Sequence, residues 1–445
     1  MFPTNFIQHL TQAKGFDADA FSAAHLLPAP ISIRFNPSKS LSQQANLESV
    51  RWHPNAYYLP QRPDFTLDPL FHAGAYYVQE ASSMSIVNFL DENFGDNRNL
   101  KILDLCAAPG GKSTLILSWL NGSGFLVANE VIKTRAAVLR DSISRWGYAN
   151  AAVSSNDPQQ FGRLHAAFDV VVVDAPCSGS GMFRKDPGAM KHWSHEAVAH
   201  CAARQHRIVQ DVWPALKPDG ILVYSTCSYS EAENEGVSRW ISEELGADII
   251  KSKALSSIPE ITEDKYGYRF YPNSIEGEGF YVSCMQKIAE RTNGASGKGG
   301  AKLNLTVCSD EVLNLIDASD ELVETTSHLG RNLLPAIEAD WLSKLTEALH
   351  VIKLGVSIGD SSKGKFIPEH DLALFNALRQ DVQSLDLPLS EALKYLKKES
   401  LPNRDDLRGM HLIRYEGLGL GWANAVQGRL NNMLPKSWRI LKDLD

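Results

Sequence analysis

The chain has 445 residues, 44% of them hydrophobic and 22% charged, which is typical of a globular protein with several domains. No apolar run approaches the length of a membrane span and the N-terminus lacks the segments of a signal peptide, so we expect a cytoplasmic protein. The net charge of −8 argues against coating nucleic acid by bulk charge, although residues 391–442 are locally basic, with ten Lys/Arg against five Asp/Glu.

The six cysteines are widely spread and none forms a C-x-x-C pair. They therefore match neither a disulfide framework nor a zinc site, and the sequence predicts free thiols and no metal.

Residues 1–75 combine short helical stretches with a strand-like segment, Ile31–Asn36, and an aromatic-rich turn, Trp52–Tyr58. This pattern predicts a small α+β lead-in. The next segment, Gly74–Met84, opens a helix of about ten residues. Within it, Gln79 and Glu80 either line a pocket or form a surface loop, and their spacing favours the loop.

From residue 100 to 290, apolar runs alternate with helical patterns. The expected strands are Ile102–Leu105, Phe125–Asn129, Ala151–Ser154, Val170–Asp174, Ile221–Ser225 and a final hairpin strand, Gly279–Met285. The alternation predicts a doubly wound, mostly parallel sheet, in which ligands bind beyond the carboxyl ends of the strands.

The first of these strands runs into a turn of small residues, Ala107, Ala108, Pro109, Gly110 and Gly111, before a helix over Lys112–Leu120. Such a turn allows a ligand to approach the backbone, and the helix N-terminus offers unpaired amides. The turn is thus expected to cradle a nucleotide or nucleoside. Its glycine spacing matches neither a dinucleotide fingerprint nor a phosphate-binding P-loop.

Four acidic residues, Asp104, Glu130, Asp157 and Asp174, stand at or near predicted strand ends. Glu130 follows the second strand, where an acid is placed to accept both ribose hydroxyls of a bound nucleoside. Asp157 either meets an adenine amino group or caps a helix.

Two cysteines also follow predicted strands: Cys177, near Asp174, and Cys227, after the next strand. A single cysteine in such a place is usually structural. Two thiols at the ends of neighbouring strands, facing the proposed cradle, indicate chemistry instead, and zinc would need more ligands than they supply.

The C-terminal part begins with residues 287–303, which are rich in Gly, Ser, Ala and Lys and predict a flexible linker. Beyond it, the sequence predicts a strand over Val351–Ile358. The chain ends with a Gly-rich segment, Gly417–Trp422, and a basic tail, Pro435–Arg439.

Several of these segments resemble the RNA cytosine-C5 methyltransferases of the Sun/Fmu group. The resemblance covers about residues 30–290 and rests on Leu103-Asp-Leu-Cys-Ala-Ala-Pro-Gly-Gly-Lys112, Asp174-Ala-Pro-Cys-Ser-Gly179, Ser225-Thr-Cys-Ser228 with Glu233-Asn-Glu235, Tyr77-Val-Gln-Glu80 and Gly277-Glu-Gly-Phe280. It implies a Rossmann-like, seven-stranded sheet that binds S-adenosylmethionine. The cofactor residues that it implies are Cys106, Ala107, Ala108, Pro109, Gly110, Gly111, Lys112, Glu130, Asp157 and Asp174.

The same resemblance implies that Cys227 is the nucleophile, that Cys177 helps to release the product and that Asp174 assists at ring nitrogen 3. Carbon 5 of cytosine is a weak nucleophile, so a thiolate first adds to carbon 6. The base must also be unstacked, which favours single-stranded or loop RNA. Phe183–Lys185 and Arg204 either hold phosphates beside this site or form a solvated basic face.

The layout is similar to the RsmF branch of the family, because about 150 residues follow the catalytic region. That likeness implies a PUA-like, RNA-binding C-terminal end and a small-subunit ribosomal RNA substrate. The expected chain is a monomer divided into a lead-in (1–75), a methyltransferase domain (76–287), a linker (288–303), an intermediate α+β region (304–383) and the PUA-like domain (384–445).

Three alternatives stay open from the sequence. The first is that the substrate is a transfer RNA, and the second is that the protein is a non-catalytic ribosome assembly factor. The third is that Cys177 is the nucleophile, as the equivalent thiol is in DNA cytosine methyltransferases. The presence of both cysteines and Asp174 argues against the assembly factor.

Overall fold

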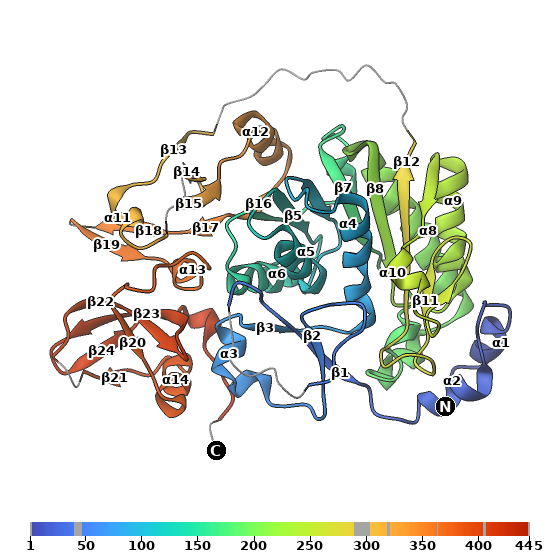
Figure 1. Cartoon of the computed structure of the whole chain (residues 1–445), viewed down its shortest axis with the longest axis horizontal. Coiled ribbons are helices and arrows are strands. Elements are labelled where there is room, and N and C mark those ends of the chain that lie inside the picture. Colours follow the sequence, from blue (N-terminus) through green and yellow to red (C-terminus); the bar gives the residue numbers. More distant parts are fainter. Residues whose placement is uncertain are drawn as a thin grey trace.

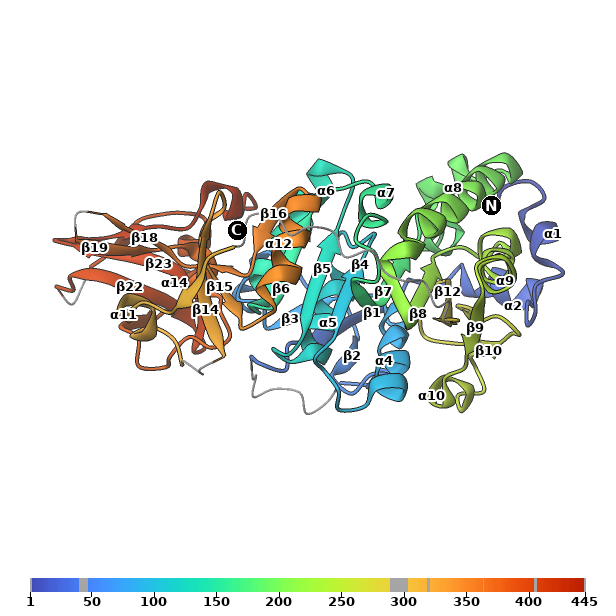
Figure 2. The same ribbon diagram turned by 90° about the horizontal axis from the view of Figure 1, so that it is seen from above.

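A mixed sheet with a parallel centre forms the middle of the molecule in the computed structural model, which describes residues 2–39, 47–288, 303–317, 321–362, 364–403 and 406–443 (Figure 1). The C-terminal region lies at one end of this sheet and the first two helices lie at the other (Figures 1 and 2). The predicted linker, 288–303, lies almost entirely outside the described residues. No helix in the described ranges is both long and apolar enough to cross a membrane.

The sheet has the strand order β10-β11-β12-β8-β7-β4-β5-β6-β16, and β9 also pairs with β12. Its strands are β4 (Lys101–Asp104), β5 (Phe125–Asn129), β6 (Ala151–Ser154), β7 (Phe168–Asp174), β8 (Leu216–Thr226), β9 (Ala247–Ile250), β10 (Thr262–Glu263), β11 (Tyr268–Phe270), β12 (Phe280–Lys287) and β16 (Val351–Leu354). The run β6-β5-β4-β7-β8 is parallel and β12 joins it antiparallel. The predicted seven-stranded methyltransferase sheet is therefore confirmed, with β10, β11 and β16 added at its edges.

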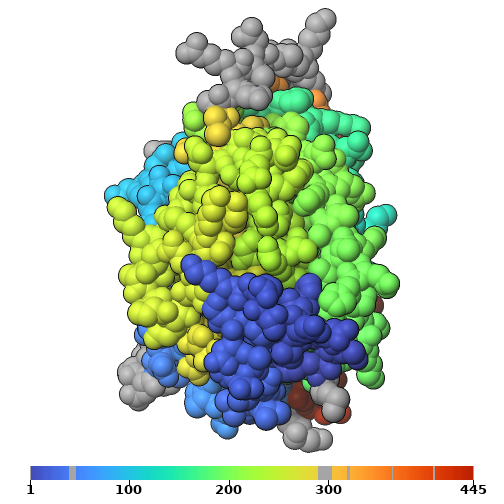
Figure 3. All heavy atoms as spheres, turned by 90° about the vertical axis from the view of Figure 1, so that its right-hand side faces the viewer, coloured from blue at the N-terminus to red at the C-terminus, as the bar shows by residue number. Residues whose placement is uncertain are grey.

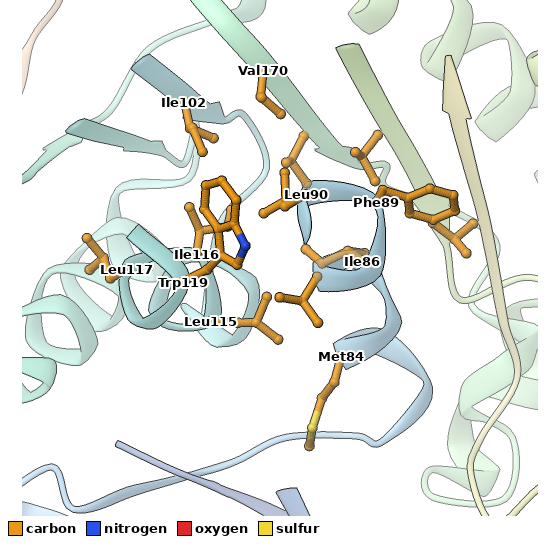
Figure 4. Close-up of a cluster of buried hydrophobic side chains, with 14 of the residues drawn as sticks. Met84, Ile86, Phe89, Leu90, Ile102, Leu115, Ile116, Leu117, Trp119 and Val170 are labelled. Carbon is orange, nitrogen blue, oxygen red and sulfur yellow. The ribbon is translucent and has the colours of Figure 1, made fainter. Parts of the chain in front are cut away.

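Helices cover both faces of the sheet because neighbouring residues on a strand point to opposite sides. The helices of this region are α4 (Ile86–Phe94), α5 (Gly111–Leu120), α6 (Lys133–Trp146), α7 (Pro158–Phe161), α8 (His195–Val212), α9 (Glu235–Glu244), α10 (Lys253–Ser256) and, from the C-terminal part, α12 (Ala339–Ala348). Ile102 packs in a core cluster with α4, α5 and α6, whereas Leu103 packs in one with α8, α9 and α12. Figure 4 shows part of the first cluster, in which Ile102 and Val170 of the sheet lie above side chains of α4 and α5.

The described residues of the N-terminal lead-in form a three-stranded sheet of order β2-β1-β3 and three short α-helices. Its elements are α1 (Phe6–Leu10), α2 (Ala18–Ala24), β1 (Ile31–Phe35), β2 (Ala56–Leu59), α3 (Pro69–His72) and β3 (Tyr76–Val78). Phe6 of α1 and Phe21 of α2 belong to a buried aromatic cluster that also contains Phe183 and Tyr229, from loops after β7 and β8. Figure 3 shows the N-terminal segment spread over this part of the surface. The first helices thus support the loops that follow two central strands.

Buried Arg34 of β1 joins the lead-in to α5. Its guanidinium donates to Thr114 Oγ1 at 2.7 Å and to Gln79 Oε1 at 3.0 Å, and burial lowers its pKa to about 9. Gln79 is buried, and Glu80 accepts backbone hydrogen bonds from Ser82 and Glu278. The surface-loop interpretation of Gln79 and Glu80 is therefore wrong, because both side chains hold segments of the fold together.

The C-terminal part contains a four-stranded sheet, a two-stranded hairpin and a five-stranded sheet of order β20-β22-β23-β24-β21. Its elements are β13 (Leu305–Val307), α11 (Asp310–Leu313), β14 (Leu322–Ser327), β15 (Gly330–Pro335), β17 (Val356–Ser357), β18 (Gly359–Ser362), β19 (Lys365–Pro368), α13 (His370–Ala373), β20 (Ser384–Asp386), α14 (Leu389–Leu396), β21 (Leu401–Pro402), β22 (Gly409–Tyr415), β23 (Leu418–Val426) and β24 (Arg429–Asn432).

The strand predicted over Val351–Ile358 is broken at Gly355. Gly355 has φ +56°, a left-handed conformation, and the carbonyl of Leu333 lies where a Cβ would project. The chain before it, β16, pairs antiparallel with β6 of the central sheet, while β17 after it pairs with β15. One apolar run therefore connects two sheets.

Candidate active site

A cavity of about 300 Å³ opens at the carboxyl ends of β4, β5, β7 and β8, where the sequence placed the ligand. The predicted site residues that line it are Cys106, Ala108, Glu130, Asp157, Asp174, Cys177 and Cys227. The other predicted cofactor residues, Ala107, Pro109, Gly110, Gly111 and Lys112, form the adjoining turn and the start of α5. The structure thus gathers residues from widely separated segments around one cavity.

The turn after β4 is held in place by the end of β5 and by α6. The Ala107 amide donates to the Asn129 carbonyl at 2.8 Å, which ties the turn to the end of β5. Gly110 has φ +117°, and a Cβ there would lie 2.9 Å from the Cβ of Ser142 on α6. Glycine is therefore required at 110 both by the backbone conformation and by the close approach of α6.

Glu130 and Asp157 lie at one end of the cavity. The nearly buried carboxylate of Glu130 accepts from the Ile132 amide at 2.9 Å and pairs with Arg135 at 3.1 Å. Asp157 caps α7 by accepting from the Gln159 amide at 3.1 Å, so its predicted capping role is confirmed. Since Asp157 also lines the cavity, capping does not remove it from the site.

Asp174 is held by two neighbours at the other end of the cavity. Its carboxylate pairs with Lys112 Nζ at 2.9 Å and accepts from Ser225 Oγ at 2.8 Å. Burial alone would lower the pKa of Lys112, but the charge of Asp174 raises it above its ordinary value. Lys112 Nζ also lies 5.1 Å from the centre of the Phe280 ring. This arrangement keeps a lysine cation and a partly exposed carboxylate together beside the thiols.

The sulfur atoms of Cys177 and Cys227 lie 3.2 Å apart, within hydrogen-bonding distance. They meet because β7 and β8 are parallel neighbours in which Asp174 pairs with Ser225. The hydrogen bond with Cys227, together with burial, raises the pKa of Cys177 well above its ordinary value. Cys177 is therefore a protonated thiol near neutral pH, and its S–H is available to the sulfur of Cys227.

Asp104 is fully buried behind the turn. One carboxylate oxygen accepts from Ser113 Oγ at 2.6 Å, while the other has no hydrogen-bond partner within the described part of the chain. Burial raises the pKa of Asp104 to about 7, against the opposing effects of Ser113 and Lys112. The folded protein therefore favours the protonated acid.

This raised pKa predicts a pH-dependent effect of Asp104→Asn on stability. In the unfolded chain the acid titrates near pH 4, so between about pH 5 and 7 the native state loses about 1.4 kcal/mol of stability per pH unit from this group. The variant, which retains an acceptor for Ser113, avoids that loss. The melting temperature of the variant relative to that of the wild type should therefore be higher at pH 8 than at pH 5. The same difference in melting temperature at both pH values would contradict the raised pKa.

Phe183–Lys185 were expected either to hold phosphates or to form a solvated basic face, and the first two residues do neither. Phe183 is fully buried in the aromatic cluster. Arg184 pairs with Glu278 at 3.2 Å, and both side chains are almost fully buried, so it is not part of a solvated basic face either. Lys185 is exposed, and Arg204 lines the cavity.

Two cationic residues of the cavity, Arg135 and Arg207, were missed at the level of sequence, and Arg135 is the one paired with Glu130. Arg207 lies three residues after Arg204 on α8 and lines the same cavity. Residues spaced by three share a helix face, so this pair carried a usable signal.

Three family models match the chain. They are described as 16S rRNA methyltransferase RsmB/F (residues 93–286), the N-terminal domain of 16S rRNA methyltransferase RsmF (residues 2–81) and the methyltransferase RsmF PUA domain (residues 382–440).

Curated relatives match over nearly the whole chain. Ribosomal RNA small subunit methyltransferase F of Vibrio vulnificus is 31% identical over 98% of this chain and 97% of its own length. The protein of the same name from Aeromonas salmonicida is 29% identical over 98% and 96%.

Solved structures share the fold of about two thirds of this chain. A methyltransferase homologue from Pyrococcus horikoshii is 27% identical, with a TM-score of 0.54 over 63% of this chain and 94% of that chain. NSun6 from the same organism, solved with SFG, is 18% identical, with a TM-score of 0.54 over 65% of this chain and 99% of that chain.

Proposed function

Because the chain belongs to the RsmF family of 16S rRNA methyltransferases, we propose that it methylates carbon 5 of a cytosine in small-subunit ribosomal RNA, with Cys227 as nucleophile. The observation that carries the proposal is the pair of thiols, 3.2 Å apart, beside the Lys112–Asp174 ion pair in one cavity. A non-catalytic assembly factor has no need of such a pair.

S-adenosylmethionine is the cofactor of the family and supplies an electrophilic methyl group when bound. The cavity suits it, because the carboxylate of Glu130 is placed to accept from ribose hydroxyls and the partly exposed apolar side chain of Ile132 lies beside it. We propose that Glu130 binds the ribose and that Asp157 binds the adenine amino group. The turn at 106–111 binds the rest of the S-adenosylmethionine molecule.

The target cytosine enters at the opposite end, next to Cys227. The thiolate of Cys227 adds to carbon 6 of the cytosine, and this addition raises the electron density at carbon 5. The proton that Cys227 loses is transferred to ring nitrogen 3 as the ring accepts electrons. The Asp174 carboxylate stabilises that N–H by accepting its hydrogen bond, and Lys112 fixes the carboxylate in place. The nearby thiol of Cys177 stabilises the Cys227 thiolate by donating its hydrogen bond.

Product release requires loss of the carbon-5 proton and expulsion of the Cys227 sulfur. Cys177 lies 3.2 Å from that sulfur and can donate its proton to it as the carbon–sulfur bond breaks. The Cys177 thiolate formed in this way takes the carbon-5 proton, and its raised pKa makes it a good proton acceptor. We propose that Cys177 takes part in this second half of the reaction, whereas Cys227 acts in the first.

Tritium release tests the reaction and its substrate together. Ribosomal RNA carrying tritium at carbon 5 of its cytosines should release label to water in proportion to the methyl groups transferred from S-adenosylmethionine. Small subunits or 16S RNA should react, and bulk transfer RNA should not. Methyl transfer without tritium release would rule out carbon 5, and a preference for transfer RNA would rule out the proposed substrate.

Glu130→Ala tests the cofactor assignment. The loss of hydrogen bonds to a buried ribose should weaken S-adenosylmethionine binding by about 1–3 kcal/mol in calorimetry. Unchanged affinity would remove Glu130 from the cofactor site. Glu311→Ala, at an exposed acid of the C-terminal part, should bind the cofactor as the wild type does.

The C-terminal domain supplies a second RNA contact in this proposal. Arg429 and Lys436 are exposed on it, so changing both to Gln should weaken RNA binding. The slope of log affinity against log salt should also fall by about one for each lost phosphate contact. Arg379→Gln is the control, because the side chain of Arg379 is partly exposed but paired with Asp381. Equal slopes for all three proteins would contradict this contact.

A further inference from the structure

Glu233 is a fully buried carboxylate directly beneath the two thiol-bearing loops. It lies at the end of a short 3-10 turn, Glu231–Glu233, that precedes α9. One of its oxygens accepts from the Ser178 amide at 2.7 Å, and the other accepts from Ser178 Oγ at 2.5 Å and from Ser228 Oγ at 2.6 Å. Gln205 of α8 donates to the first oxygen at 3.3 Å.

These donors belong to the residues that immediately follow the two cysteines, because Ser178 follows Cys177 and Ser228 follows Cys227. The ladder between β7 and β8 ends with the pair Asp174 and Ser225, before either cysteine is reached. Beyond that point the Gly181 amide donates to the Cys227 carbonyl at 2.7 Å, and the Tyr229 amide donates to Ser180 Oγ at 2.9 Å. The Glu233 carboxylate adds a link between the two residues that directly follow the cysteines, because it binds both serines.

Burying the Glu233 carboxylate costs free energy, which indicates that this residue has a specific role. A buried charge without a cation is strongly disfavoured unless hydrogen bonds satisfy it. In the described part of the chain no Lys, Arg or His forms an ion pair with Glu233, so the serines, the Ser178 amide and Gln205 carry that task. Charge-assisted hydrogen bonds of this kind are short and hold their donors in well-defined directions.

We propose that Glu233 is a positioning residue that fixes the Cys177 and Cys227 thiols against each other across the site. Glu233 does not line the cavity, so it acts through Ser178 and Ser228. Its consequence for catalysis rests on the proposed function, because both thiols must then reach the same base. The distance between the two thiols can be tested whether or not the proposed function is correct.

Thiol–disulfide equilibrium measures this separation in the full-length protein. In a glutathione buffer the two thiols give up two electrons and two protons, and oxidised glutathione becomes two reduced glutathiones as the Cys177–Cys227 disulfide forms. The equilibrium constant gives the effective concentration of one thiol at the other. Mass spectrometry of the linked peptide, followed against the ratio of reduced to oxidised glutathione, provides the readout.

Glu233→Ala should lower this effective concentration by about 10- to 100-fold, the scale expected when reacting groups are displaced by about 1 Å. Glu233→Gln should have a smaller effect, since one amide oxygen remains as an acceptor. Ser178→Ala combined with Ser228→Ala should reproduce the loss without changing Glu233. If Glu233→Ala fails to fold, the Gln variant and the double serine variant decide the matter.

Glu235→Gln is the matched control, because Glu235 is a buried acid two residues away that pairs with Arg269 instead of the cysteine loops. It should destabilise the protein yet leave the effective concentration of the thiols unchanged. An equal loss in the Glu233 and Glu235 variants would reduce Glu233 to a general structural role. No loss in any Glu233 or serine variant would overturn the proposal outright.

Kinetics separate this inference from the function on which it partly rests. Glu233→Gln should lower kcat for methyl transfer and leave KM for S-adenosylmethionine near the wild-type value, because the cofactor end of the cavity is untouched. A wild-type protein without cytosine methylation would refute the proposed function, while the thiol equilibrium would still decide the role of Glu233. A changed KM with unchanged kcat would contradict positioning of the thiols.

Discussion

Cys227→Ala is expected to lower the rate of methyl transfer by on the order of 10⁴-fold or more, the scale seen when an enzyme loses its nucleophile. Without the thiolate, nothing adds to carbon 6 and carbon 5 stays unreactive. Cofactor binding should survive, because the Glu130 end of the cavity is unchanged. Methyl transfer from labelled S-adenosylmethionine and cofactor calorimetry on the same preparation check both statements.

The opposite assignment of the two thiols predicts a different result. If Cys177 were the nucleophile, Cys227→Ala would retain covalent attachment to RNA and Cys177→Ala would abolish it. The control is Cys284→Ala, at a buried cysteine of β12 in the core, which should affect stability but not the chemistry. Loss of activity to the same extent in all three variants would indicate unfolding and not catalysis.

Cys177→Ala is expected to trap the enzyme on its substrate. Cys227 can still attack carbon 6, but the step that expels it loses the thiol 3.2 Å away. A covalent protein–RNA complex should therefore accumulate and survive denaturing electrophoresis, with turnover falling by about 10²- to 10⁴-fold, as expected for a lost general base. Normal turnover with no adduct would show that Cys177 is not needed for release.

The parts of the site that follow local patterns could be predicted from sequence. Apolar runs marked the central strands, and the polar residues directly after them mark the edge where ligands bind. That rule placed Glu130, Asp174, Cys177 and Cys227 around one cavity, as the structure has them. The final hairpin strand and the helix after the small-residue turn are likewise confirmed.

Contacts between distant segments could not be predicted in this way. No local sequence pattern shows that Arg34 donates a hydrogen bond to Thr114 or that Arg184 forms an ion pair with Glu278, because buried contacts depend on the final packing. Both interpretations of Arg184 that the sequence left open, a phosphate ligand and a solvated basic face, were accordingly wrong. A basic residue beside a site is informative only once its partner is known.

The sequence predicted a flexible linker over 288–303 that separates the methyltransferase domain from the regions after it, which implies that a chain cut near residue 300 stays folded. The structure contradicts that independence, because β16 forms an edge strand of the central sheet and Leu342 and Leu345 of α12 belong to its core. Such a truncation would expose the β6 edge and a hydrophobic surface. Point variants such as those at Arg429 and Lys436 are therefore the better test of RNA binding.

The most direct measurement is bisulfite sequencing of total RNA from three strains that express the wild-type chain, Cys227→Ala or no copy of the gene. The account predicts one or more 5-methylcytosines in 16S ribosomal RNA that are present with the wild-type chain and absent from the other two strains. Identical 16S patterns in all three strains would contradict it, as would a methylated cytosine that disappears from transfer RNA alone.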